Sequence, residues 1–230
     1  DLKPFYSDEE IAAMDDKAQL NALNKLWRNF CISDTFEPGS TVKPMTVAAA
    51  LESGSISTDD TYYCNGFKTV SGLKIKCAVY PNGHGTLSLG DSLKYSCNVA
   101  MMDIANKTGS ENFLKYQKIF NFGDYTGIDL PGESSGILHS QQSLGPTELA
   151  TAAFGQGFTG TMIQEISAFS SVINGGTYYK PYVVRSVTDG NGAVVKNTAP
   201  VMVRKTISPD VSNEVRKYLG TVMESDGSGA

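Results

Sequence analysis

Residues 37–44 constrain this chain most, because turn-forming residues lead there directly into an apolar stretch. Pro38 and Gly39 favour a turn. Residues 45–51 are almost entirely apolar, and Gly54 then provides a stop, so the spacing predicts a buried helix. The sequence therefore places Ser40 where a loop becomes a helix.

Lys43 follows Ser40 by three residues, which puts both side chains on one face of a helix. A serine hydroxyl becomes a nucleophile when a neighbouring base takes its proton, and a buried lysine can be neutral enough to do so. Free amide N–H groups at a helix start could bind a developing oxyanion. On this pattern alone, an N-cap serine and a surface lysine are the favoured interpretation. The Ser-x-x-Lys spacing also recurs at Ser71 and Lys74, inside a glycine-containing loop.

The composition indicates a globular chain that forms one domain over residues 1–230. Of 230 residues, 40% are hydrophobic and 19% are charged. The net charge of −5 provides no basic surface for nucleic acid. No apolar run reaches the roughly 20 residues that a membrane span needs.

A second polar segment, Ser96-Cys97-Asn98, interrupts two helical patterns at residues 87–95 and 99–106. Thr86 is expected to cap the first of these helices, and His84 is expected to be a loop residue. A serine and an asparagine two residues apart can relay a proton and hold a substrate amide. Residues 110–112 (Ser-Glu-Asn) match equally well but favour an N-cap. Residues 107–109 (Lys-Thr-Gly) favour a helix end.

Other local signals predict the outer parts of the chain. Residues 7–10 are typical of a capping box that opens a helix reaching about residue 24, and Trp27 is expected in the core. Residues 155–157 (Gly-Gln-Gly) indicate a close backbone approach. Residues 189–192 indicate a hairpin turn, and Ser208 and Pro209 indicate the start of a last helix.

Four cysteines occur, at positions 31, 64, 77 and 97. No Cys-x-x-Cys pair or histidine cluster is present, so the sequence predicts no metal site. Three full disulfide pairings, or four free thiols, are all compatible with the spacing.

Taken in order, these segments resemble the transpeptidase domain of class B penicillin-binding proteins of the cell-division and sporulation type. The similarity covers nearly the whole chain. It rests on five segments: 27–29 (WRN), 36–44 (FEPGSTVKP), 95–98 (YSCN), 127–133 (GIDLPGE) and 154–157 (FGQG). The ordered set reverses the earlier preference at Ser40. It implies an α+β fold in which helices flank an antiparallel sheet and the nucleophile helix is buried.

The resemblance implies a D,D-transpeptidase that cross-links peptidoglycan stem peptides and is acylated by β-lactams, without a cofactor. Ser40 would be the nucleophile, Lys43 its base, Ser96 the proton relay and Asn98 the substrate-binding amide. A full-length protein would act at the outer face of the bacterial cytoplasmic membrane, anchored by an N-terminal segment outside this chain. Division or sporulation membrane proteins are possible partners. A β-lactamase-like sensor or hydrolase and a non-catalytic scaffold are the alternatives.

Two departures from the family pattern stand out. The family's strand-borne Lys-Thr-Gly motif is missing, so the chain is expected to be truncated before it and to be impaired by itself. Cys97 occupies the middle of the Ser96–Asn98 segment, and is either a small buried residue or half of a redox gate formed with Cys77. A Cys64–Cys77 disulfide is the competing pair.

Overall fold

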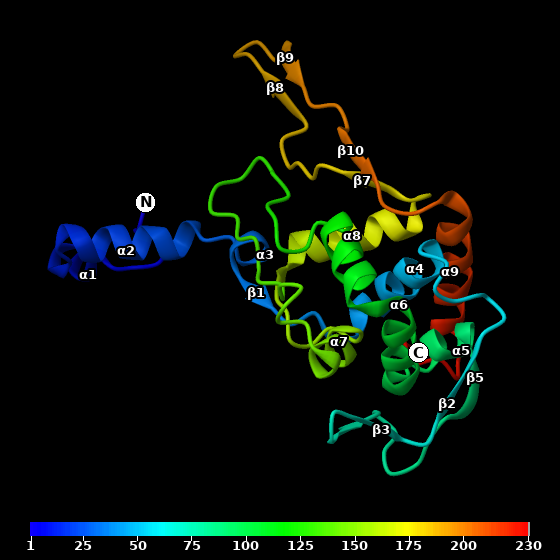
Figure 1. Cartoon of the computed structure of the whole chain (residues 1–230). Helices are drawn as coiled ribbons and strands as arrows, with labels where there is room; N and C mark the ends of the chain where they lie inside the picture. Colours follow the sequence, from blue (N-terminus) through cyan, green and yellow to red (C-terminus); the bar gives the residue numbers. More distant parts are fainter. Residues whose placement is uncertain (230) are drawn as a thin grey trace.

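The computed structural model describes residues 1–229, and its centre is the helix that the apolar stretch predicts. Helix α4 (Lys43–Glu52) buries every residue from position 43 to position 50. Three longer helices pack around it, as Figure 1 shows. They are α6 (Asn98–Ile119), α8 (Met162–Ile173) and α9 (Pro209–Val222). Because residues 45–51 of α4 are almost entirely apolar, the helix can be stable only where other elements cover it.

Helix α6 is the longest helix of the described chain and carries a kink. Gly109 leaves the helical conformation at φ 76°, ψ 156°, which glycine adopts without steric cost. Residues 107–109 therefore lie within a bent helix and not on a strand edge, as the cap pattern predicts. The first helical segment therefore ends at Gly109 as predicted, and a second segment follows it and buries Phe113 and Leu114 in the core.

The strands of the described residues form two-stranded antiparallel pairs. These are β1 (Thr35–Phe36) with β6 (Gly160–Thr161), β2 (Thr61–Cys64) with β5 (Gly85–Ser88), β3 (Phe67–Val70) with β4 (Leu73–Lys76), β7 (Thr177–Tyr179) with β10 (Met202–Lys205), and β8 (Ser186–Thr188) with β9 (Val194–Asn197). The α+β class is confirmed, and these short ladders surround the helical centre.

Three short elements connect these parts. They are α5 (Leu89–Lys94), α7 (Pro146–Ala152) and the 3-10 helix η1 (Gly39–Val42). The expected cap of α5 was wrong by two residues: Ser88 caps the helix, and Thr86 instead pairs in β5 with Tyr63 of β2. Strand pairing with β2 takes precedence over a local cap there.

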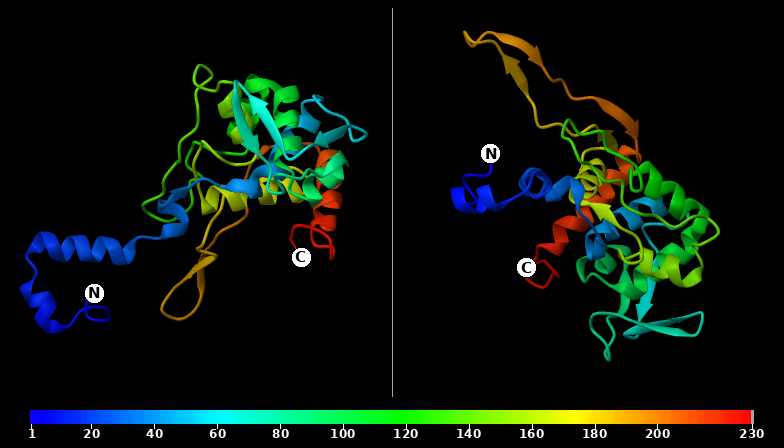
Figure 2. Two further views of the ribbon diagram at one scale, coloured as in Figure 1. Left: turned by 90° about the horizontal axis from the view of Figure 1, so that it is seen from below. Right: turned by 90° about the vertical axis from the view of Figure 1, so that its left-hand side faces the viewer.

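The N-terminal helices project from the body of the protein, as Figures 1 and 2 show. Ser7 forms the predicted capping box at α1 (Asp8–Ala13), but Asp15 caps a new helix, α2 (Asp16–Trp27). Helix α3 (Phe30–Ser33) then leads to β1. The prediction that Trp27 is a core residue was wrong, because its side chain is 65% exposed on the projecting arm.

The hairpin signal at residues 189–192 is confirmed by the pair β8–β9, which also projects (Figure 2). Ser208 caps α9 with Pro209 in its first turn, as predicted. Within residues 1–229, no helix combines the length and apolar character that crossing a membrane requires.

Candidate active site

Ser40 lies in η1, immediately before α4, at the loop-to-helix junction that the sequence predicts. Gly39 precedes it with φ 67°, a conformation that a side chain would strain. Pro44 is tolerated because it occupies the first turn of α4, where its missing N–H has no intrahelical partner to lose. The chain therefore enters the helix at a fixed angle, and Ser40 is held at its start.

Residues 155–157, which follow α7, hydrogen-bond to the loop that precedes Ser40. The Gly39 amide donates to the Gly155 carbonyl at 2.9 Å, and the Gly157 amide donates to Glu37 Oε1 at 2.7 Å. A Cβ at Gly155 would lie only 2.1 Å from the Gly39 carbonyl oxygen. This is the close backbone approach predicted from residues 155–157. The Thr46 hydroxyl adds a bond to the Ala153 carbonyl at 2.9 Å.

Lys43 is buried, with 2% of its surface exposed, and its amine is fully engaged. Its Nζ lies 2.6 Å from the Ser96 carbonyl oxygen, 2.7 Å from Ser96 Oγ and 2.7 Å from Asn98 Oδ1. A charged ammonium would donate to all three oxygens. A neutral amine could instead donate to two of them and accept the Ser96 hydroxyl proton. The arrangement therefore accommodates the amine in both protonation states.

Burial lowers the pKa of Lys43 to about 8, because the charged form loses its hydration. The negative forms of Cys77 and Cys97 oppose this shift in pKa but do not cancel it. A lysine with this pKa has a substantial neutral fraction near neutral pH, as a general base requires.

Ser96 adopts a left-handed backbone conformation, with φ 50°. Such a conformation is uncommon for a residue with a Cβ, and it persists only where the surroundings impose it. Cys97 then caps α6, since its sulfur accepts from the Ala100 amide at 3.4 Å. Asn98 follows as the first residue of α6. The sharp turn thus directs Ser96 and Asn98 to the same amine.

A cavity of about 290 Å³ opens over these groups. Ser40, Lys43 and Ser96 all line it, together with apolar side chains from α5, α8 and α9. The hydrogen bonds of Lys43 go to Ser96 and Asn98, while Ser40 borders the same cavity. A hydroxyl, a buried amine and a second hydroxyl therefore face one space, as serine acyl transfer requires.

The competing sequence matches do not reach this cavity. Ser71 and Lys74 lie at the tip and in one strand of the hairpin β3–β4. Ser110 directly follows the non-helical Gly109, where the second helical segment of α6 begins, and its hydroxyl accepts from Gln141 Nε2 at 3.0 Å. The fold therefore places Ser40 and Lys43 at the cavity and keeps the second Ser-x-x-Lys match, at Ser71, away from it.

Two glutamates, Glu165 and Glu133, make different contacts. The Thr41 hydroxyl donates to Glu165 Oε1, and burial raises the pKa of Glu165. Glu133 instead accepts from the Thr126 and Gly127 amides, at 2.6 and 3.0 Å, and so holds its own loop. Sequence spacing provided no signal for the Thr41–Glu165 contact, because the two residues come from distant helices.

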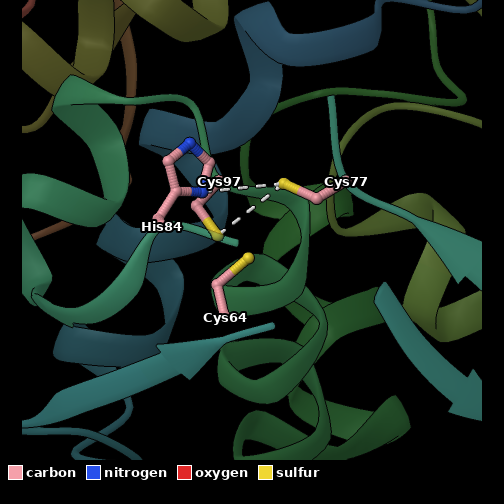
Figure 3. A group of neighbouring side chains, drawn as sticks. All are labelled: Cys64, Cys77, His84 and Cys97. Atoms are coloured by element: carbon pink, nitrogen blue, oxygen red, sulfur yellow. Dashed lines mark hydrogen bonds between the residues drawn. The ribbon is translucent and has the colours of Figure 1, made fainter. Parts of the chain in front are cut away.

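The cysteines of the predicted redox gate lie beside the site, as thiols. Cys77 Sγ and Cys97 Sγ are 3.9 Å apart, and Cys64 and His84 join them (Figure 3). The hydrogen bond between these two sulfurs lowers the pKa of Cys77 and raises that of Cys97. The gate stays a prediction. Sequence spacing gives no signal for the convergence of Cys64 and His84 on these thiols, because the residues lie far apart in the chain.

Comparisons with known proteins agree on one family. The family described as "Penicillin binding protein transpeptidase domain" matches residues 7–230. Stage V sporulation protein D of Bacillus subtilis is 39% identical over 204 residues, which cover 88% of this chain and 31% of that protein. Peptidoglycan D,D-transpeptidase FtsI of Escherichia coli is 30% identical over 186 residues, covering 77% of this chain and 30% of that protein.

A solved structure shows the same fold. Penicillin-binding protein 3 of Mycobacterium tuberculosis, complexed with aztreonam, is 25% identical, with a TM-score of 0.76. The match covers 87% of this chain and 46% of that one. The chain thus spans roughly a third of the length of the two curated relatives named above.

Proposed function

This chain belongs to the family of penicillin-binding protein transpeptidase domains, and we propose that the full-length protein is a class B serine D,D-transpeptidase. Its reaction would cross-link peptidoglycan stem peptides through an acyl-enzyme on Ser40, and β-lactams would acylate the same serine. The observation that carries this proposal is the convergence of Lys43 Nζ on Ser96 and Asn98, within 2.7 Å, beside Ser40.

In the proposed first step, Ser40 Oγ attacks the carbonyl between two terminal D-alanines while Lys43 takes the hydroxyl proton. The Ser40 amide donates to the oxyanion that forms. Ser96 passes a proton to the departing D-alanine nitrogen, and the C–N bond breaks to leave an ester on Ser40. Asn98 holds the substrate amide. The amine of a second stem peptide then attacks the ester, loses a proton and releases Ser40.

A second oxyanion donor is proposed to come from a strand-borne Lys-Thr-Gly motif elsewhere in the full-length protein. Within residues 1–229 the Lys-Thr-Gly sequence lies in α6 and cannot provide it. On this basis the 230-residue chain alone is expected to be acylated poorly. Stoichiometric labelling of the isolated chain by a fluorescent penicillin would contradict that expectation.

Labelling of the full-length protein with a fluorescent penicillin tests the nucleophile. Replacing Ser40 with alanine should abolish labelling, because it removes the proposed nucleophile from the cavity that Lys43 lines. Ser71→Ala is the matched control, since Ser71 has the same Ser-x-x-Lys spacing but lies in the β3–β4 turn. Equal loss of labelling in both variants would contradict the assignment.

The persistence of the label distinguishes the alternatives. A transpeptidase should hold the penicilloyl group for many minutes, whereas a β-lactamase would release it rapidly. A β-lactamase needs a group that activates water for deacylation, and Glu133 is instead bound to its own loop. A scaffold would show no Ser40-dependent labelling at all.

We further propose that the full-length protein works at the outer face of the bacterial cytoplasmic membrane, held by an anchor outside this chain. Division or sporulation membrane proteins would be its partners. The names of the relatives support both roles, because one is a sporulation protein and the other an FtsI transpeptidase. Fractionation of cells expressing the full-length protein, with protease added outside, tests the location.

A further inference from the structure

Four side chains that can bind a metal converge beside the start of α6. They are the thiols of Cys64, Cys77 and Cys97 and the imidazole of His84, whose ligand atoms all lie within 4.8 Å of one another. Figure 3 shows the three sulfurs and the histidine ring gathered around one point. Twelve residues separate Cys64 from Cys77, six separate Cys77 from His84, and twelve more separate His84 from Cys97. Spacings this long explain why no short metal motif is visible.

The interatomic distances fit a single ion. Cys77 Sγ lies 3.9 Å from Cys97 Sγ and 3.8 Å from His84 Nδ1. Around a tetrahedral zinc ion, the bond lengths place two sulfurs about 3.8 Å apart and a sulfur and a nitrogen about 3.6 Å apart. A disulfide would instead bring two sulfurs to about 2.05 Å. Cys77, Cys97 and His84 therefore already have separations close to those of zinc ligands, and the Cys64 sulfur lies within 4.8 Å of each of them.

The backbone is built to bring these ligands together. Gly83 lies so close to Cys64 that a Cβ there would be 2.0 Å from the Cys64 carbonyl oxygen. The Cys77 amide donates to the Gly66 carbonyl at 2.8 Å, and Cys64 pairs with Gly85 in the β2–β5 ladder. The residues that flank His84 and the residues that follow Cys64 thus pack against each other before any ion binds.

The surroundings suit bound thiolates. Cys64, Cys77 and Cys97 are 1%, 4% and 0% exposed, so water does not compete as a ligand. The Ala100 amide donates to Cys97 Sγ at 3.4 Å, a bond that stabilises a negative sulfur. The His84 ring stacks on Tyr95 with its centroid 6.0 Å away, which fixes the direction of its nitrogen.

We propose that Cys64, Cys77, His84 and Cys97 bind one Zn²⁺ ion in a closed, four-coordinate structural site. Three thiolates and an imidazole in a tetrahedral arrangement are typical of zinc, whereas calcium and magnesium require oxygen ligands. Four ligand atoms within 4.8 Å surround one ion and leave no room for an iron–sulfur cluster. On binding, the three thiols release three protons to solvent, and no electron is transferred.

The ion would link the 64–85 segment to the turn at residues 96–98, which carries two of the proposed active-site residues. Cys64, Cys77 and His84 belong to the β2–β5 region, while Cys97 lies between Ser96 and Asn98 at the start of α6. The Asn98 side chain also donates to the Lys76 carbonyl at 3.5 Å, next to Cys77. Zinc would therefore fasten the 64–85 segment to the turn that presents Ser96 and Asn98.

Metal analysis of the full-length protein, purified under reducing conditions without chelator and incubated with Zn²⁺, tests the site. We expect about one zinc ion per chain after removal of unbound metal. Cys64→Ser should lose the ion, whereas Cys31→Ser should keep it, because Cys31 lies outside the cluster. Zinc that is absent, or that Cys64→Ser retains, overturns the proposal.

Cobalt substitution of the unaltered protein covers the case in which a cysteine variant does not fold. Co²⁺ in this site should give sulfur-to-cobalt charge-transfer bands and the intense visible bands of a tetrahedral complex. His84→Ala should weaken Co²⁺ binding by at least about 10-fold, since loss of a ligand exceeds the effect of an outer partner. His139→Ala, which removes the other histidine of the chain, should leave binding unchanged. An octahedral spectrum overturns the proposal.

The redox gate and the zinc site both use Cys77 and Cys97, but the two hypotheses require different sets of residues. A gate needs Cys77 and Cys97 only, whereas zinc also needs Cys64 and His84. Mass spectrometry of the protein isolated from its own oxidising compartment, with free thiols blocked, separates them. A Cys77–Cys97 disulfide in protein that contains no zinc would overturn the metal site. Neither readout depends on transpeptidase activity.

Discussion

At the scale of single residues, the proposed role of Lys43 as a base depends on its burial. Its ammonium form is disfavoured by lost hydration, so its pKa falls from 10.5 to about 8. Only the neutral amine can take the Ser40 proton, and the neutral fraction rises with pH through that value. The rate of penicillin acylation should therefore rise about 10-fold per pH unit below about 8 and level off above it.

Stopped-flow labelling of the full-length protein between pH 5 and pH 10 measures this profile. Lys43→Arg provides the control, because a guanidinium stays protonated over this range and should show a very low rate throughout. A midpoint near the ordinary lysine value, or a rate that does not change with pH, would contradict the role of burial. The pH window follows from the lowered pKa of Lys43.

At the scale of elements, the position of Ser40 depends on the contact between η1 and the 155–157 segment. Gly155 has φ 86°, and an added Cβ would meet Gly39 backbone atoms at 2.1 and 2.4 Å. We expect Gly155→Ala to cost about 2 kcal/mol or more of unfolding free energy and to slow acylation, because the Ser40 loop must move.

Gly190→Ala is the matched change, since nothing lies within 4 Å of a Cβ at that position in the projecting hairpin. Thermal melting and penicillin labelling of the two variants make the comparison. If Gly155→Ala melts and reacts like Gly190→Ala, then backbone contact between these elements does not position the nucleophile.

At the scale of the whole molecule, the stability is concentrated in the helical centre and not in the projecting parts. Val47, in α4, is 0% exposed, whereas Val195, in β9, is 68% exposed. Val47→Ala should lower the unfolding free energy by about 2 kcal/mol, because it removes buried methyl groups and leaves a cavity. Val195→Ala should change it by less than about 0.5 kcal/mol.

Denaturant unfolding of both variants, followed by circular dichroism, tests this division. The substitution is chemically identical, so only the surroundings differ. Equal losses would indicate that the β8–β9 hairpin packs against another part of the full-length protein. An unchanged value for Val47→Ala would mean that α4 is not the centre of the core.

The sequence by itself determined the elements whose signals are local. The apolar run after Ser40 dictates a buried helix, the turn at residues 189–192 dictates a hairpin, and Ser208 dictates a helix start. In each case a few adjacent residues fix the backbone, either through caps and turns or through the need to remove apolar surface from water.

Tertiary structure alone decided which matching segments form the site. Ser40 and Ser71 share a spacing, yet Ser40 and not Ser71 lines the cavity that holds the buried Lys43, because α4 is enclosed by α6, α8 and α9. Trp27 is a large apolar residue of the kind expected in a core, but it lies exposed on the projecting N-terminal arm. The convergence of Cys64 and His84 on Cys97 likewise follows from strand pairing and close glycine contacts between distant residues, which no local pattern encodes.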